Sequence, residues 1–174
     1  MIEHEMKKSL DLPSKVTIYP SQDRAIDKVL TELMSACPAQ YALLAESSGQ
    51  LITLCGERET GDPVSLASLI AGDMAASQEI ARITGQYQHY QFVLREGIAS
   101  NTFISEAGEH LLLFVQVAKN VPLGWARLII SEAGRKLADI MVSEPEEAHS
   151  FKFEVASDEL DRWANDALNS LWEK

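Results

Sequence analysis

Residues 110–130 read HLLLFVQVAKNVPLGWARLII, and this stretch holds the clearest folding signal in the chain. Residues 111–117 are almost all apolar, which suits a strand whose two faces are both buried. Pro122 cannot continue a central strand but fits the first turn of a helix. Apolar residues then recur at helical spacing as far as Met141. We therefore expect a central strand that runs directly into a helix covering the same sheet.

A helix and a β-hairpin are predicted nearer the N-terminus. Ser21 is a suitable N-cap, an apolar stripe follows it, and Pro38 ends the helix. Residues 41–45 and 51–55 form two apolar segments separated by the turn-forming letters SSGQ, which indicates a hairpin. Residues 1–20 are polar, and we interpret them as a tail or an added edge strand.

A second helix has an unusual composition. It begins at Asp62, an N-cap acceptor followed by Pro63, and extends to about Thr84, with Gly85 as its stop. Apolar and small residues cover more than one of its faces, although a helix that packs only on its own sheet needs one apolar stripe. The additional small residues would allow a second helix to approach closely. A helix buried deeply in its own subunit explains the sequence equally well.

Two further strands precede the central one. Residues 90–95 lead through Glu96 and Gly97 into residues 98–104, which we interpret as another tight hairpin. The predicted order over residues 21–142 is therefore helix, two strands, helix, three strands, helix.

The composition changes after residue 142. Residues 143–150, SEPEEAHS, are typical of a linker, and residues 151–155 alternate as a short strand would. Residues 143–174 contain nine acidic and three basic residues. The last segment is a sharply amphipathic helix, which must cover its own domain or a partner. Its apolar stripe includes Leu160, Trp163, Leu168 and Leu171.

The composition also excludes several classes of protein. At 174 residues the chain suits one domain with appendages, and its net charge of −11 argues against nucleic-acid or anionic membrane partners. No apolar run approaches the ~20 residues that span a bilayer, and the N-terminus lacks a signal-peptide core, so we expect a cytoplasmic protein. Cys37 and Cys55 are interpreted as two small buried thiols, and no metal-ligand spacing is present.

A search for catalytic chemistry gives no candidate. The phosphate-loop, dinucleotide and nucleophile-elbow patterns are all missing from the sequence. Glu57 and Glu59 are expected to be solvated carboxylates in a charged loop. Four arginines could each enter another protein's nucleotide site, but a solvated or ion-paired surface role is favoured for each. We therefore expect no catalytic residues, no cofactor and no metal. The four arginines are Arg58, Arg82, Arg95 and Arg127.

The order of elements resembles the Roadblock/LC7 family, whose members include the bacterial MglB proteins. Residues 41–55, YALLAESSGQLITLC, are similar to the first hairpin of the family. The Ala- and Ser-rich helix at residues 66–83, the hairpin at residues 91–104 and LLLFVQVAKNVPLGWAR at residues 111–127 extend the resemblance. The Pro-Leu-Gly at residues 122–124 is frequent in the family.

The resemblance implies an α/β fold and a homodimer. A five-stranded, mainly antiparallel sheet would lie between helices, in the order α-β-β-α-β-β-β-α, and residues 143–174 would be a C-terminal extension. The resemblance also implies that the edge strand after the second helix pairs with its counterpart while the second helices pack together. The residues expected in that interface are Leu66, Leu69, Ile70, Asp73, Met74, Ser77, Ile80, Ala81, Tyr90, Phe92 and Leu94.

Members of this family regulate Ras-like small GTPases or serve as platforms for them. The resemblance thus implies a non-enzymatic regulator or scaffold of an MglA-like GTPase that supplies no arginine finger. An adaptor that binds a non-GTPase partner through the sheet face or the C-terminal helix is the alternative, and an enzyme or small-molecule sensor is a third hypothesis. The residues expected to contact the partner are Arg82, Leu160, Trp163, Leu168 and Leu171.

Overall fold

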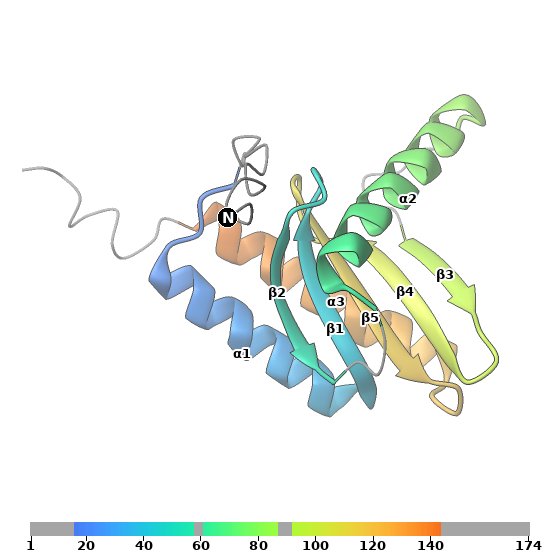
Figure 1. Cartoon of the computed structure of the whole chain (residues 1–174), viewed down its shortest axis with the longest axis horizontal. Coiled ribbons are helices and arrows are strands. Elements are labelled where there is room, and N and C mark those ends of the chain that lie inside the picture. The colour runs from blue at the N-terminus through green and yellow to red at the C-terminus, as the bar shows by residue number, and fades with distance from the viewer. Residues whose placement is uncertain (1–15, 58–60, 87–91, 144–174) are drawn as a thin grey trace, which may run out of the picture. The chain divides into compact units, whose positions relative to one another are not determined.

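A computed structural model describes residues 16–57, 61–86 and 92–143. In this part of the chain three helices and five strands follow one another in the predicted order (Figure 1). The segments predicted as an N-terminal tail (up to residue 15) and as a C-terminal extension (from residue 144) lie outside the described residues. The elements are α1 (Pro20–Ala36), β1 (Ala39–Glu46), β2 (Leu51–Gly56), α2 (Pro63–Ile83), β3 (Phe92–Glu96), β4 (Ser100–Glu106), β5 (Leu111–Ala118) and α3 (Leu123–Val142).

The sheet is antiparallel throughout, and β5 is its central strand. The strand order is β2-β1-β5-β4-β3, so the last strand in sequence lies between β1 and β4. Leu113 of β5 pairs with Leu44, and Phe114 pairs with Ile104. Successive β5 residues face opposite sides, and both Leu112 and Leu113 are buried. The prediction of a strand buried on both faces is confirmed.

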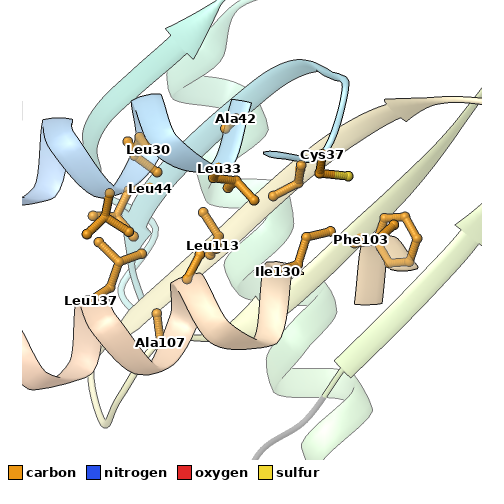
Figure 2. Close-up of a cluster of buried hydrophobic side chains, with 14 of the residues drawn as sticks. Leu30, Leu33, Cys37, Ala42, Leu44, Phe103, Ala107, Leu113, Ile130 and Leu137 are labelled. Atoms are coloured by element: carbon orange, nitrogen blue, oxygen red, sulfur yellow. The ribbon is translucent and has the colours of Figure 1, made fainter. Parts of the chain in front are cut away.

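Two helices cover one face of the sheet and one helix covers the other. The larger core cluster joins α1 and α3 to alternate residues of the strands, including Leu44, Leu113 and Phe103 (Figure 2). The smaller cluster joins α2 to the opposite face, where Leu43 and Phe114 contribute. The α-β-β-α-β-β-β-α fold with a five-stranded sheet between helices is therefore confirmed.

The first helix begins two residues earlier than the sequence predicts. Tyr19 is the N-cap and Pro20 opens the helix, whereas Ser21 was the predicted cap. The side-chain oxygen of Gln22 accepts a hydrogen bond from the Tyr19 N–H at 3.1 Å and satisfies a donor that a capping serine would not reach. The Gln22 amide also donates to the carbonyl of Ile140 at 3.0 Å, so the start of α1 is tied to the end of α3.

Two other boundaries differ from the prediction. The fourth strand begins at Ser100 rather than at Ile98, because the turn after β3 uses residues 97–99 and closes with a Gly97 N–H to Ser100 carbonyl bond of 3.0 Å. Ile98 is consequently fully exposed. Pro122 is the N-cap of α3 rather than its first residue. No helix among the described residues is long and apolar enough to cross a bilayer.

Candidate interaction surface

The ends of α2 form as the sequence predicts. The Asp62 carboxylate accepts a hydrogen bond of 2.8 Å from the Ser65 N–H and another of 2.7 Å from the Ser65 hydroxyl. These bonds satisfy a donor of the first turn that has no partner inside the helix. Gly85 follows the C-cap Thr84 with a φ of +69°, which favours glycine at this stop.

The inner face of α2 packs on the sheet of its own chain. Ile70 and Met74 are 2% and 1% exposed and belong to the same cluster as Tyr41 and Phe114. The Ser68 side chain also lies near the β1–β2 turn, 3.5 Å from the carbonyl oxygen of Gly49. The inner face is therefore already covered.

The opposite face of α2 is apolar and uncovered within the described chain. Leu69, Ile80 and Ile83 are 70%, 63% and 72% exposed, although buried leucine and isoleucine side chains are the norm. Gly72 and Ala76 lie between them, and a Cβ added at Gly72 would meet no atom within 4 Å. These five residues follow one another at intervals of three or four, so they share one helix face. We call Leu69, Gly72, Ala76, Ile80 and Ile83 the outer stripe.

The strand β3 forms one edge of the described sheet, next to the flank of α2. The Arg95 guanidinium binds the Asp73 carboxylate at 2.6 Å and so connects β3 to α2. This hydrogen bond raises the pKa of Arg95. On the other face of the sheet Phe92 packs 5.5 Å from the Phe103 ring centroid, and the Arg127 guanidinium lies 5.1 Å above the Phe92 ring.

The residues predicted for a dimer interface occupy three environments. Leu69 and Ile80 are exposed on the outer stripe, and Leu94 is 39% exposed on the edge strand. Ile70 and Met74 are buried in the chain's own core and are unavailable to a partner. Tyr90 lies outside the described residues. The remaining predicted residues are half-buried: Leu66, Asp73, Ser77, Ala81 and Phe92.

Three members of the outer stripe are not among the residues predicted for the interface: Gly72, Ala76 and Ile83. The spacing of three or four residues that links them to Leu69 would have found them, once one face of the helix was assigned to the sheet. Of the predicted partner contacts, Arg82 is exposed and binds the Glu79 carboxylate through two bonds of 2.6 and 2.8 Å. The others, Leu160, Trp163, Leu168 and Leu171, lie outside the described residues.

One hollow in the described part of the chain is a surface groove. Its volume is about 450 Å³, and most of its lining is apolar. In the part of the chain that the structure describes, no group of three or more His, Cys, Asp or Glu residues could hold a metal ion. The outer stripe is an exposed apolar surface of the kind that marks association sites. The groove is lined by Val16, Ile18, Pro20, Asp23, Glu46, Gln50, Leu51 and Ile52.

Comparison with known proteins defines the family. Neither protein-family models nor curated protein sequences gave a match. Among solved structures, a Roadblock/LC7 domain from Streptomyces avermitilis shares the fold with a TM-score of 0.52 at 18% identity, covering 66% of this chain and 90% of its own. Myxococcus xanthus MglB is 30% identical with a TM-score of 0.62, covering 66% of this chain and 93% of its own.

Two other MglB structures agree with this assignment. The gliding protein MglB from Thermus thermophilus is 29% identical with a TM-score of 0.65, covering 73% of this chain and 96% of its own. An MglB with a tetrameric arrangement is 28% identical with a TM-score of 0.67, covering 73% of this chain and 95% of its own. The fold is that of a Roadblock/LC7 domain. The chain belongs to the Roadblock/LC7 family, and within that family it is similar to MglB.

Proposed function

We propose that this chain is a non-enzymatic, homodimeric regulator of a Ras-like small GTPase of the MglA type. The observation that carries the proposal is the exposed outer stripe of α2 on a chain similar to MglB. A soluble domain gains nothing from leaving three large apolar side chains in water on one helix face unless another surface covers them. A second copy of α2 supplies a surface of the same character.

The size of the outer stripe supports association that also uses β3. Complete burial of a leucine or isoleucine contributes about 1.5–3 kcal/mol, so Leu69, Ile80 and Ile83 would each contribute roughly 1–2 kcal/mol from the area still exposed. Six such side chains in a dimer give roughly 6–12 kcal/mol, against an association cost of about 4–15 kcal/mol. The two ranges overlap, so the stripe alone is marginal. Pairing of the β3 edges would add backbone hydrogen bonds, and Gly72 and Ala76 would let the helices approach closely.

In the described part of the chain, the contacts of three arginines support regulation without an arginine finger; Arg58, the fourth candidate, lies outside the described residues. Arg82 is held by Glu79, Arg95 is held by Asp73, and Arg127 lies over an aromatic ring. A finger must leave such contacts to reach a phosphate. We therefore infer that the chain acts by positioning elements of the GTPase, whose own residues carry out hydrolysis.

Single-turnover GTP hydrolysis tests the proposal. The MglA-like GTPase from the same genome is loaded with GTP and mixed with an excess of the full chain, of Arg82→Ala or of Ile80→Asp. We expect faster hydrolysis with the wild type and a loss of the effect with Ile80→Asp. Arg82→Ala should weaken binding but reach the same maximal rate at saturation, because Arg82 is a predicted partner contact and not an arginine finger. Failure of every such GTPase to bind or to change its rate would overturn the proposal. Recovery of a non-GTPase protein in its place would favour the adaptor alternative.

A further inference from the structure

The helix α2 is anchored unevenly along its length. Its buried residues are Ala67, Ile70, Ala71 and Met74, all in the first twelve positions. Every residue from 75 to 83 is described, and none of them is buried. In Figure 1 the C-terminal half of α2 extends past the ends of the strands. Apolar packing therefore fixes the first turns of α2 but not the direction of the remainder.

Two polar contacts join α2 to strands β3 and β4. Both lie close to Met74, the last buried residue of the helix. Asp73 accepts a hydrogen bond of 2.6 Å from Arg95 of β3. The Gln78 amide donates to the Glu106 carboxylate at the end of β4. The two partners, Arg95 and Glu106, belong to the edge strand β3 and to its neighbour β4. These contacts oppose a rotation of α2 away from that edge.

The Asp73–Arg95 pair contributes little to folding. The Arg95 side chain is 58% exposed, and solvent-exposed pairs are worth at most about 1 kcal/mol. The second carboxylate oxygen of Asp73 is buried and has no hydrogen-bond partner among the described residues. Burial of an unsatisfied oxygen opposes folding. Because the net effect of the pair on stability is so small, its main consequence is to fix the direction of α2 relative to β3.

The direction of α2 matters because a small rotation of the helix produces a large displacement at its C-terminal end. Ile83 lies ten residues beyond Asp73, which is about 15 Å along a helix. A rotation of only about 10° at Asp73 would move Ile83 by roughly 3 Å at that radius. A second copy must meet the outer stripe and the β3 edge together, so a shift of that size would separate the two contact surfaces.

We propose that Asp73 and Arg95 are positioning residues for self-association, because their ion pair sets the direction of the outer stripe relative to the β3 edge. This inference rests on the proposed homodimer and identifies the residues that prepare each chain for it. The pair acts within one chain. It therefore controls the affinity of the dimer without having to touch the second copy.

The test measures the dimer dissociation constant of the full chain by sedimentation equilibrium and the free energy of unfolding by urea titration. The variants are Asp73→Asn, Arg95→Gln, the two combined, and the charge exchange of Asp73→Arg with Arg95→Asp. Glu32→Gln is the matched control, because it breaks the 3.3 Å Lys136–Glu32 pair on the opposite face of the sheet. We expect a roughly 5- to 20-fold weaker dimer for each single variant. The combined variant should be no weaker than either, and the charge exchange should recover most of the affinity.

The results separate this inference from the proposed function. A wild-type chain that stays monomeric would overturn the homodimer and this inference with it. A wild-type dimer whose dissociation constant responds to Asp73→Asn and Arg95→Gln no more than to Glu32→Gln would overturn the inference alone. The inference would also be overturned if the combined variant raised the dissociation constant by the product of the two single effects. Either single substitution already breaks the ion pair, so the second should add little.

Discussion

Replacement of Ile80 by aspartate should separate the proposed dimer while leaving each chain folded. Ile80 is 63% exposed, so it contributes little to the core of its own chain. Burial of the exposed part in an interface is worth roughly 1–2 kcal/mol. A two-fold symmetric dimer loses that contribution twice, or about 2–4 kcal/mol, and a carboxylate placed in an apolar contact adds to the loss. At about 1.4 kcal/mol per tenfold, the dissociation constant should rise by roughly 30- to 1,000-fold.

Leu128→Asp provides the matched control. Leu128 is 56% exposed on α3, so it offers the same change of chemistry at a similar exposure outside the proposed interface. Sedimentation velocity over a concentration series should show a shift to monomer for Ile80→Asp and no shift for Leu128→Asp. In urea titration of the monomer, each substitution should change the free energy of unfolding by about 0.5 kcal/mol or less, as ordinary surface substitutions do. Equal dissociation constants for Ile80→Asp and the wild type would refute the assignment of the outer stripe to self-association.

Three further substitutions or treatments test the fold itself. Gly56→Ala should lower the free energy of unfolding by about 1–3 kcal/mol in urea titration, because φ is +92° and the new methyl group would lie 2.8 Å from Met34 Cε and collide with the Gln40 carbonyl. Gln22→Ala should lower it by about 1–3 kcal/mol, since the Tyr19 N–H would lose its acceptor and the Ile140 carbonyl would lose one of its two side-chain donors; a change as small as for an exposed residue would contradict this. Burial raises the pKa of the Cys37 thiol, so the folded state holds this proton more tightly than the unfolded state. The contribution of the Cys37 thiol to stability is complete below the usual thiol pKa and is lost as the pH rises from there through the raised pKa of the folded state. Cys37 should also resist a thiol reagent until urea unfolds the chain.

The sequence predicts the order of the elements because each element carries a local signal. The apolar run of β5, the Asp62 cap and the stop at Gly85 depend only on neighbouring residues. The faces of α2 could not be assigned in this way. Ile70 and Ile80 are both isoleucines in the same helix, yet one is 2% exposed and the other 63%, because the sheet lies under only one of them.

The candidate site was harder to predict than the fold, because it depends on contacts between distant residues. Asp73 and Arg95 are 22 positions apart and meet only after β3 takes its place in the sheet. Ile98 illustrates the opposite error. Its apolar side chain fits a strand pattern, but the geometry of the tight turn places it in solvent.

The unequal helix cover of the two faces of the sheet supports the proposed second copy as a cover for α2. Five strands spaced about 4.8 Å apart form a sheet about 19 Å wide between its outer strands, whereas a packed helix covers about 10 Å. Two helices, α1 and α3, therefore suffice for one face, and a bond of 3.2 Å from the Trp125 indole to the Ala36 carbonyl joins them. On the other face α2 packs over β1, β2 and β5, and it reaches β3 and β4 through the side chains of Arg95 and Glu106. Arg95 of β3 stays exposed on this side, where one more helix would complete the layer. We propose that another molecule of the same chain supplies this second helix, which would lie against the flank of α2 nearest β3 and against the adjoining side of the outer stripe.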